Sequence, residues 1–437
     1  MSGRTLSVLI NNQNIGTLHE ADGIWAFNYT DSWLANSHAF ALSPRLPLHA
    51  VPIQDSGTRR YVQWYFDNLL PEEGQRTLLA GDAKIDSADA FGLLTYYGAE
   101  SAGSITLISP DQSIDSTGAS RLRTLSDDSL SQRIRAMPTV SLSRMAKKKM
   151  SLAGAQHKLA INFHQGELFE PIGETPSTHI LKPNHPNTDY PHSVINEFFV
   201  MRLAGKLGLN VPEVHRRYVP EPVYIIQRFD RKLTGSTIER VHTIDACQLL
   251  GLDKAYKYTQ GSLTKLAELA NACRSSAIAR TRLFNWLTFN VLIGNTDAHL
   301  KNLSFLVSSQ GIQLAPHYDM LSTACYETQA FDKNDWPSST TLAWPIATTS
   351  KFTELNRATL LEAGETLMIN RSTALRLLET QCQQIAKAAQ HLYDEIVIEN
   401  NELQKRQPEL GLIIDGELRC LRTIQFSIIK DMLNQLG

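Results

Sequence analysis

The chain has 437 residues, which at about 150 residues per domain predicts two or three domains, each able to bury its own core. Its 42 lysines and arginines nearly balance 44 aspartates and glutamates, which excludes a polycationic protein that binds nucleic acid mainly by neutralising phosphates. Neither a membrane-spanning apolar run nor a signal-peptide pattern stands out, so we expect a cytoplasmic protein without membrane contact. Five widely spaced cysteines, with no C-x-x-C, are expected to be reduced and structural.

Residues 1–110 predict a compact α/β module. Two strand-like segments, residues 5–10 and 15–18, flank turn-forming asparagines as in a β-hairpin. The aromatic segment 61–70 predicts a buried helix or helix end that stops at Pro71, and residues 105–108 predict a strand.

Residues 111–150 are rich in Ser, Thr, Asp and Arg and end in three lysines, which predicts a linker. Beyond it, residues 151–163 indicate a turn of small residues followed by a strand, and residues 178–182 and 224–227 indicate two more strands. A helix is expected from about Ser193, as N-cap, to residue 207.

After about residue 236 the pattern is mostly helical. Residues 284–293 are apolar on nearly every face and predict a buried helix, and apolar positions between 375 and 392 recur at helical spacing. Strands followed by helices predict an α+β, two-lobed protein-kinase-like fold. Its mixed β-sheet N-lobe covers about residues 151–235 and its mostly helical C-lobe about 236–437, with the α/β module as N-terminal subdomain.

The most informative segment follows the buried helix. Protein kinases use D-x-x-x-x-N and a later aspartate to orient the acceptor hydroxyl and hold Mg²⁺. Asp297 and Asn302 have this spacing, and Asp319 lies seventeen residues after Asn302. A turn aspartate is the alternative for Asp297 taken alone, because D-x-x-x-x-N also occurs by chance. The order of all three after a buried helix favours the kinase interpretation.

Upstream residues fit the same scheme. Lys182 ends a strand, as does the phosphate-contacting lysine of protein kinases, and Glu197 on the next helix is its candidate ion-pair partner. The phosphate loop would be residues 151–158, which contain the single glycine Gly154 and match no standard phosphate-loop motif. Residues 227–230 lie where the lobes should join and would contact the nucleoside. A surface lysine, a solvated glutamate and a charged turn remain the alternatives.

Five segments together resemble the motifs of the HipA family, the serine/threonine kinase toxins of bacterial type II toxin–antitoxin systems. They are SLAGAQHK (151–158), THILK (178–182), RFDR (228–231), NTDAHLKN (295–302) and YD (318–319). The N-terminal segments FDNLLP (66–71) and GSITL (103–107) also resemble that family's N-terminal subdomain. The resemblance covers nearly the whole chain.

The resemblance implies ATP and Mg²⁺ as cofactors, Asp297 as the catalytic aspartate, and Asn302 and Asp319 as Mg²⁺ ligands. The implied nucleotide contacts are Ala153, Gly154, Ala155, Lys158, Lys182, Gln227, Arg228, Phe229, Asp230, His299, Lys301 and Tyr318. Within that set, the Asp230 carboxylate would accept from ribose hydroxyls.

The family also implies that Ser151 is autophosphorylated and that this inactivates the kinase, because a phosphoserine in the phosphate loop would repel ATP. A turn-capping serine is the alternative. The expected partners are a HipB-like helix-turn-helix antitoxin, operator DNA contacted mainly through that antitoxin, and a protein substrate. Aminoacyl-tRNA synthetases are the substrate class, with glutamyl-tRNA synthetase the first choice. Two other functions stay open: a catalytically weak corepressor subunit of an antitoxin–operator complex, and a small-molecule kinase.

Overall fold

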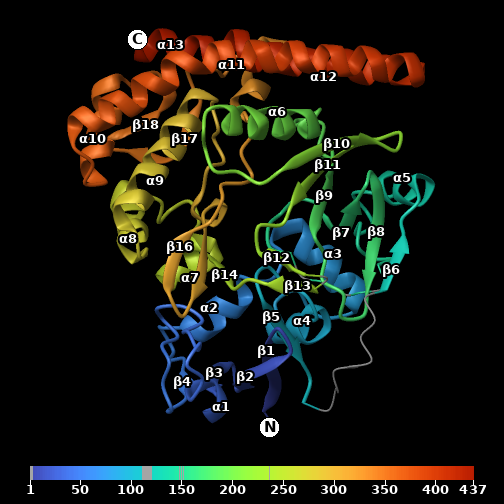
Figure 1. The fold of residues 1–437 in the computed structure, drawn as a ribbon, viewed down its shortest axis with the longest axis vertical. Coiled ribbons are helices and arrows are strands. Elements are labelled where there is room, and N and C mark those ends of the chain that lie inside the picture. Colours follow the sequence, from blue (N-terminus) through green and yellow to red (C-terminus); the bar gives the residue numbers. More distant parts are fainter. Residues whose placement is uncertain (1–2, 111–120, 147, 149, 151, 236) are drawn as a thin grey trace. The chain divides into compact units, whose positions relative to one another are not determined.

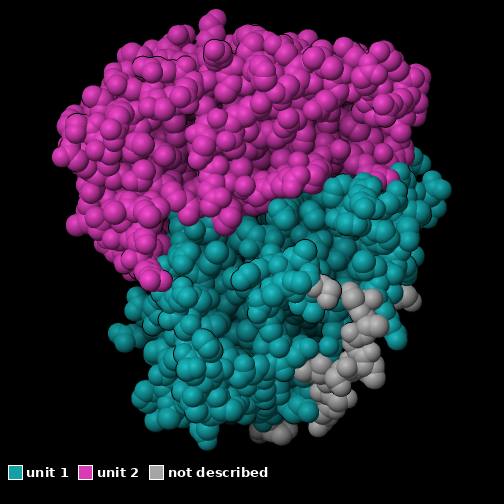
Figure 2. All heavy atoms as spheres, viewed as in Figure 1, with its two compact units in different colours: residues 1–183, 225–256, 304–315 teal, residues 184–224, 257–303, 316–437 magenta. Residues whose placement is uncertain are grey.

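The computed structural model describes residues 3–110, 121–146, 148, 150, 152–235 and 237–437 (Figure 1). The chain forms two compact units, coloured separately in Figure 2. Unit 1 contains residues 1–183, 225–256 and 304–315, and unit 2 contains residues 184–224, 257–303 and 316–437. Both units combine segments that are distant in sequence. The predicted domain division stays a prediction.

The N-terminal part of unit 1 contains a five-stranded sheet of order β4-β3-β2-β1-β5. The predicted hairpin and the strand at 105–108 are confirmed. The strands are β1 (Arg4–Ile10), β2 (Gln13–Ala21), β3 (Ile24–Tyr29), β4 (Ile53–Gln54) and β5 (Ile105–Ile108). The helices are α1 (Asp31–Leu34), α2 (Tyr61–Asp67), α3 (Glu73–Ala83) and α4 (Ala90–Tyr97), so the helix expected over 61–70 forms and ends earlier.

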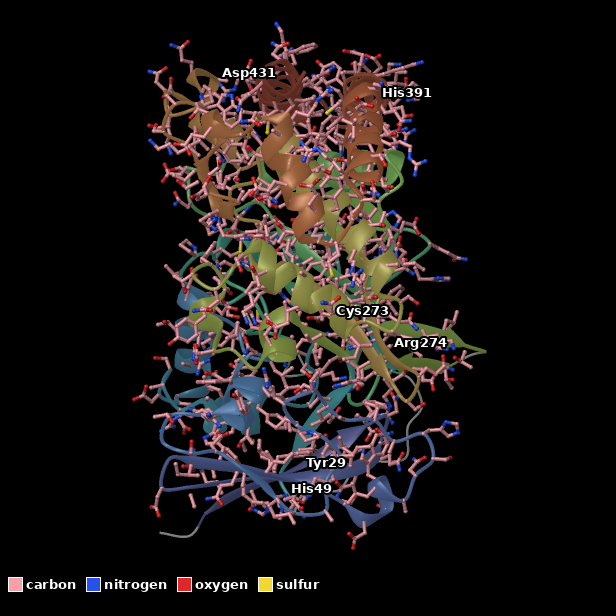
Figure 3. All side chains as sticks on the ribbon, turned by 90° about the vertical axis from the view of Figure 1, so that its left-hand side faces the viewer. Tyr29, His49, Cys273, Arg274, His391 and Asp431 are labelled. Atoms are coloured by element: carbon pink, nitrogen blue, oxygen red, sulfur yellow. The ribbon has the colours of Figure 1, made fainter. Side chains whose placement is uncertain are left out.

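Alternating apolar residues of β3 make the core of this part. The Phe27 ring packs edge-on against Tyr29 at 4.7 Å and lies 5.8 Å from the Phe66 ring of α2. The buried Tyr29 hydroxyl, labelled in Figure 3, donates to the Leu46 carbonyl at 2.7 Å and accepts from the Leu42 amide at 2.8 Å. Burying a tyrosine here is tolerated because its hydroxyl is hydrogen-bonded.

Part of the predicted linker is ordered structure. Residues 121–124 form β6, which pairs with β8 as the edge of an antiparallel arrangement β9-β7-β8-β6, and residues 127–135 form α5. Arg133 of α5 and Glu170 of β8 form a buried ion pair at 2.6 Å. A sequence rich in Ser, Asp and Arg resembles a linker, but here some of its charges are paired inside unit 1.

The other elements of unit 1 confirm the strands expected at 151–163 and 178–182. They are β7 (Leu159–His164), β8 (Glu167–Ile172), β9 (His179–Pro183), β12 (Arg231–Thr234), β13 (Thr237–Arg240), β14 (Thr243–Asp245), α7 (Ala246–Leu250), η1 (Lys254–Tyr256), β15 (Ser304–Ser308) and β16 (Gly311–Leu314). Strand β11 (Pro222–Gln227) begins in unit 2 and ends in unit 1.

Unit 2 is mostly helical, as predicted for the C-terminal part. Its helices are α6 (Ser193–Lys206), α8 (Leu263–Ala272), α9 (Ser276–Leu292), α10 (Arg357–Thr366), α11 (Arg371–Arg406), α12 (Gly411–Thr423), η7 (Ile424–Ile429) and α13 (Lys430–Leu436). Short turns η2 (Leu300–Asn302), η3 (Ala324–Glu327), η4 (Gln329–Phe331), η5 (Phe352–Glu354) and η6 (Pro408–Leu410) and strands β10 (Val214–Tyr218), β17 (Thr341–Ile346) and β18 (Thr349–Lys351) complete it. Helix α6 packs against α11 and α12 (Figure 1). Within the described ranges, none of the helices is both long and apolar enough to cross a bilayer.

The start of α6 differs by one residue from the expectation. The N-cap is His192, in the left-handed conformation with φ of 58°, and Ser193 is the first helical residue. The Ser193 hydroxyl instead accepts from the amide of His185 at 2.8 Å. The expected end is confirmed, because Gly208 adopts a φ of +81°, which is accessible to glycine at little cost.

Candidate active site

The loop that carries Asp297 is fixed by its connection to α9. The buried helix turns at Gly294, whose φ is +62°, and the Asn295 amide donates to the Asn290 carbonyl at 2.9 Å. The two asparagine side chains also bond, from Asn295 Nδ2 to Asn290 Oδ1 at 2.7 Å. Asn295 Oδ1 in turn accepts from the Asp297 amide at 2.9 Å. An asparagine that bonds to the backbone two residues on stabilises a turn, so this loop has one defined path.

Asn302 and Asp319 lie close to this loop, as predicted. The Asn302 amide group donates from Nδ2 to the Asp297 carbonyl at 3.0 Å, and the Tyr318 hydroxyl donates to the Lys301 carbonyl at 2.9 Å. Asp319 adopts a left-handed conformation with φ of 57°, which is uncommon for residues other than glycine but is more accessible to aspartate than to most. These residues all belong to unit 2.

The charges around Asp297 set its proton affinity. Burial raises the pKa of the Asp297 carboxyl above its usual range, and the nearby Asp319 carboxylate raises it further. His299, the Tyr258 hydroxyl and Lys257 act in the opposite direction without cancelling the effect. A carboxylate with a raised pKa accepts a proton more readily, as a catalytic base should.

Glu197 shares this environment. Glu197 lies on α6 and is 3% exposed. The pKa of the nearby Tyr224 hydroxyl is raised well above its usual range, first by the burial of Tyr224 and then by the Glu197 and Asp319 carboxylates. The structure therefore brings Glu197 close to the Asp319 region within unit 2. Its predicted partner Lys182 belongs to unit 1, and the ion pair remains a prediction.

The side chains here fit a hard divalent cation. The amide oxygen of Asn302 and the carboxylate of Asp319 are the oxygen donors that Mg²⁺ prefers, and Mg²⁺ usually keeps water and phosphate ligands besides one or two carboxylates. Among the residues that the model covers, no group of three or more His, Cys, Asp or Glu forms a self-sufficient metal cage. The arrangement therefore suits a cation that arrives with a nucleotide.

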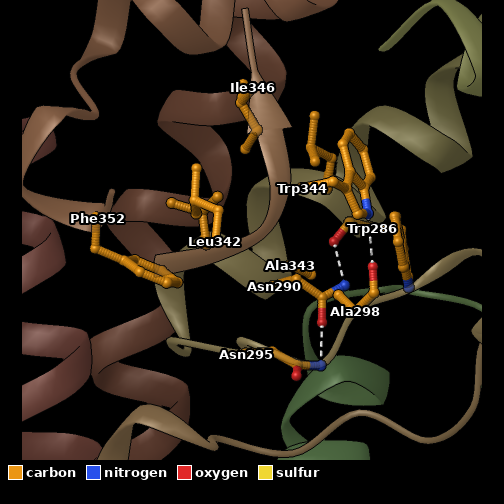
Figure 4. Close-up of a pocket in the computed structure, with 11 residues that line it drawn as sticks. Trp286, Asn290, Asn295, Ala298, Leu342, Ala343, Trp344, Ile346 and Phe352 are labelled. Atoms are coloured by element: carbon orange, nitrogen blue, oxygen red, sulfur yellow. Dashed lines mark hydrogen bonds between the residues drawn. The ribbon is translucent and has the colours of Figure 1, made fainter. Parts of the chain in front are cut away.

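A small apolar pocket lies beside the catalytic loop (Figure 4). It is lined by Trp286, Leu287, Asn290, Val291, Asn295, Ala298, Leu342, Ala343, Trp344, Ile346 and Phe352. The Trp344 indole N–H donates to the Ala298 carbonyl at 2.9 Å, next to Asp297. Strand β17 thereby contacts the loop that carries Asp297 from the side of this pocket.

The predicted phosphate loop lies in unit 1. Gly154 has a φ of +107°, and a Cβ there would approach Lys158 Nζ to 2.7 Å, so the position requires glycine. Lys158 Nζ donates to the Ala153 carbonyl at 2.5 Å, and the Glu72 amide donates to the Gly154 carbonyl at 3.2 Å. Ala155 is exposed, whereas Ser151 falls outside the described residues.

Strand pairing places Lys182 at the end of the β7–β9 pair that adjoins this loop. Leu159 of β7 pairs with Leu181 of β9, so the antiparallel register aligns Lys158 with Lys182. The amide of Arg228 donates to the Thr178 carbonyl at 2.9 Å, at the other end of β9. The two predicted contact regions are thus separated by roughly 13 Å along one strand, at about 3.3 Å per residue.

Arg228 and Asp230 contact each other within unit 1, and their predicted nucleotide contacts remain predictions. The Arg228 guanidinium donates to both oxygens of Asp230, at 2.9 and 2.7 Å, and the Gly103 amide donates to Asp230 Oδ2 at 2.6 Å. Although burial opposes it, the positive charges of Arg228 and Arg231 lower the pKa of Asp230 to about 2. Both carboxylate oxygens thus accept hydrogen bonds from groups of unit 1.

Gln227 is exposed and Phe229 is half-buried. The backbone contacts predicted for these two residues with the nucleoside remain predictions.

The centre of this network is Glu100, which is fully buried. Its carboxylate pairs with Lys148 at 2.6 Å, Arg231 at 3.1 Å, Arg228 at 3.3 Å and Arg240 at 3.8 Å. These cations keep the pKa of Glu100 well below its usual range despite burial. Burial lowers the pKa of Lys148 to about 8. We call Glu100, Lys148, Arg228, Asp230, Arg231 and Arg240 the buried charge cluster.

Sequence reasoning missed two features of this region. Glu100 lies in a segment of small residues that resembles a turn, and its partners are distant in sequence. Tyr258 precedes the catalytic loop by almost forty residues, yet its hydroxyl donates to Asp297 Oδ1. Neither residue belongs to a spacing pattern, so only the structure identifies them.

Comparisons with known proteins identify the family of this chain. Residues 150–390 match the model of the HipA-like C-terminal domain, and residues 6–108 match that of the HipA N-terminal domain. A protein of Sinorhizobium fredii is 34% identical over 75% of this chain and 79% of its own length. The serine/threonine-protein kinase toxin HipA of Shewanella oneidensis is 32% identical over 69% of this chain and 71% of its own length.

A solved structure confirms the predicted α+β kinase-like fold. The chain matches a structure from the Shewanella oneidensis toxin–antitoxin system of HipA, HipB and operator DNA with a TM-score of 0.75 and 26% identity. The match covers 98% of this chain and 99% of the other. The resemblance seen in the sequence motifs is therefore confirmed, and this chain belongs to the HipA family of serine/threonine kinases.

Proposed function

We propose that this chain transfers the γ-phosphate of ATP to a serine or threonine of a protein substrate, with Asp297 as the catalytic aspartate. The observation that carries the proposal is the defined turn that holds Asp297 beside Asn302 and Asp319. In this role the Asp297 carboxylate orients the acceptor hydroxyl and receives its proton, and its raised pKa favours that transfer.

Asn302 and Asp319 would hold Mg²⁺ through their side-chain oxygens. When bound, the ion offsets negative charge on the phosphate oxygens. Lys182 and the loop of residues 152–158 are the proposed phosphate contacts, since the β7–β9 register aligns Lys182 with Lys158. His299, Lys301 and Tyr318 remain proposed nucleotide contacts.

The catalytic proposal is tested by Asp297→Asn, which keeps the shape of the side chain and removes its basicity. Full-length proteins are incubated with γ-labelled ATP, Mg²⁺ and a cell lysate. We expect protein labelling to fall by at least about a hundredfold, the usual minimum contribution of a positioned base. Asp394→Asn, an exposed change on α11, is the matched control and should label like wild type. Equal labelling by the Asp297 variant would exclude the proposed role, and a labelled metabolite alone would favour a small-molecule kinase.

The biological role is proposed as that of a growth-arresting toxin restrained by a HipB-like antitoxin. Support comes from the Shewanella oneidensis relative, which is named a kinase toxin, and from the related complex that contains HipB and operator DNA. An aminoacyl-tRNA synthetase, first of all glutamyl-tRNA synthetase, is the proposed substrate. The chain's net charge of −2 favours an antitoxin that supplies most DNA phosphate contacts. A corepressor role in the same complex is compatible with kinase activity.

Autophosphorylation of Ser151 is proposed from the family resemblance. The residue precedes the glycine turn at Gly154, and a phosphate there would add about −1.5 to −2 charges next to the proposed ATP-phosphate contacts. Mass spectrometry of the protein expressed in active form should find phosphate on Ser151, which the Asp297→Asn variant should lack. A wild-type protein without that phosphate would contradict this role.

A further inference from the structure

The catalytic carboxylate has a partner that the proposed reaction does not use. The hydroxyl of Tyr258 donates a hydrogen bond to Asp297 Oδ1. Its ring lies edge-on to the His299 ring at 5.0 Å, and Lys257 Nζ lies 5.3 Å from the centre of the Tyr258 ring. The side chain is 38% exposed, so it reaches Asp297 from the solvent-accessible side of the loop.

This hydrogen bond is the one that an acceptor hydroxyl has to make. In protein kinases the catalytic aspartate accepts the proton of the substrate hydroxyl, which must therefore donate to the same carboxylate. A phenolic O–H is a donor of similar size to the O–H of serine or threonine. Tyr258 thus occupies an acceptor site on Asp297 Oδ1, and an incoming hydroxyl that donates to this oxygen competes with it.

The main chain on both sides of Tyr258 is fixed. The Lys257 carbonyl accepts from the Leu300 amide at 3.1 Å, which ties the segment to the catalytic loop. Gly261 lies against Trp344, where a Cβ would approach the indole to 2.6 Å, and its amide donates to the Tyr258 carbonyl at 2.9 Å. Trp344 itself is anchored to Ala298 beside the pocket (Figure 4). Tyr258 can therefore leave Asp297 by rotating its side chain, without movement of the backbone.

We propose that Tyr258 is an internal pseudosubstrate: its hydroxyl occupies the acceptor place on Asp297 and must rotate away before a protein substrate can bind. This inference rests on the proposed function of Asp297. It makes Tyr258 a determinant of the KM for the protein acceptor and leaves ATP binding and the chemical step to other residues. A tyrosine that instead positioned Asp297 for catalysis would chiefly affect kcat.

The test compares full-length wild type with Tyr258→Phe, which removes the hydroxyl and keeps the ring. Phosphate transfer from γ-labelled ATP with Mg²⁺ is measured at varied concentrations of myelin basic protein, a generic serine and threonine acceptor. We expect the KM for this acceptor to fall about fivefold, the factor that corresponds to one net hydrogen bond, with kcat and the KM for ATP unchanged. Tyr256→Phe, an exposed tyrosine two residues earlier, is the control and should behave like wild type.

The outcomes separate this inference from the proposed function. A lower kcat, or an unchanged KM, in a Tyr258→Phe enzyme whose activity depends on Asp297 would overturn the pseudosubstrate role alone. Phosphate found on Tyr258 after incubation with ATP would also overturn it, because the residue would then be an acceptor. Transfer that is equally strong in Asp297→Asn would remove the proposed function, and this inference with it.

Discussion

At the scale of single residues, the side chain of Asp230 has partners within unit 1 that the motif alone does not reveal. The motif resemblance suggests an acceptor for ribose hydroxyls, whereas both carboxylate oxygens accept hydrogen bonds from Arg228 and one also accepts from the Gly103 amide. Leaving buried cations without a counter-charge is costly, so we expect this carboxylate to matter for stability more than for nucleotide binding. The stabilisation that this carboxylate contributes should also depend on pH.

We predict that Asp230→Asn lowers the free energy of unfolding by about 3–5 kcal/mol at pH 7, because it breaks a buried ion pair. The pKa of Asp230 is about 2 in the folded state and about 3.9 in unfolded chains, so the unfolded state binds more protons between these values. The stabilisation is present above about pH 4 and is lost as the pH falls towards 2.

Urea unfolding of both proteins at pH 7 and pH 3 measures this difference. We expect it to be smaller at pH 3, and we expect the KM for ATP to be unchanged in the variant. Asp394→Asn on the surface of α11 serves as the control. A higher KM for ATP with unchanged stability would instead support the ribose contact.

At the scale of elements, the turn from α9 into the loop that carries Asp297 depends on one glycine. Gly294 has a φ of +62°, and a Cβ at this position would lie 2.7 Å from Ile428 Cγ2 and 2.8 Å from Ala324 Cβ. Its carbonyl also accepts from the Ala324 amide at 2.9 Å. Gly294 therefore lies where the end of α9 meets η7 and the start of η3, and only glycine fits at this position.

Replacement of Gly294 by alanine should lower the free energy of unfolding by about 2–4 kcal/mol, from the unfavourable φ and from overpacking. It should also lower kinase activity, because Asp297 follows this turn by three residues. Gly205→Ala is the matched control within unit 2. A Cβ at Gly205 would lie 3.4 Å from its nearest described neighbour, which is an ordinary contact distance. Because alanine favours a helix more than glycine does, the melting temperature of this variant should be unchanged or slightly higher. Equal melting temperatures for both variants would contradict the packing argument.

At the scale of the whole molecule, the N-terminal residues and the first part of the kinase domain form one compact unit. Two separate family models match residues 6–108 and 150–390, yet unit 1 takes residues from both ranges. Glu100 comes from the first range and pairs with Arg228 and Arg231 from the second. We therefore expect the two matched regions to depend on each other for folding.

A chain that begins at residue 150 should not fold into a stable monomer. It lacks Glu100, so Arg228, Arg231 and Arg240 would lose a fully buried counter-charge, and β8 would lose its edge partner β6. We expect an insoluble or aggregated product, judged by size-exclusion chromatography and thermal unfolding, and we expect the full chain, as the control, to elute as a folded species with a cooperative transition. A soluble fragment with a cooperative transition would show that the kinase region folds alone.

Sequence by itself determined the features that depend on local pattern. The hairpin at β1–β2, the buried helix α9 and the spacing of Asp297, Asn302 and Asp319 follow from periodicity and motifs, because neighbours in sequence set them. Family membership followed for the same reason, since its motifs are short and local.

Only the tertiary structure decided the roles that depend on distant residues. The buried charge cluster needs Glu100, Lys148 and Arg228 to meet, and the sequence gives no spacing rule for side chains separated by up to 128 positions. The hydrogen bond from Tyr258 to Asp297 likewise joins residues 39 positions apart. Such contacts form because folding removes these groups from water and makes each polar atom find a partner, and that partner is set by the packing of the whole chain.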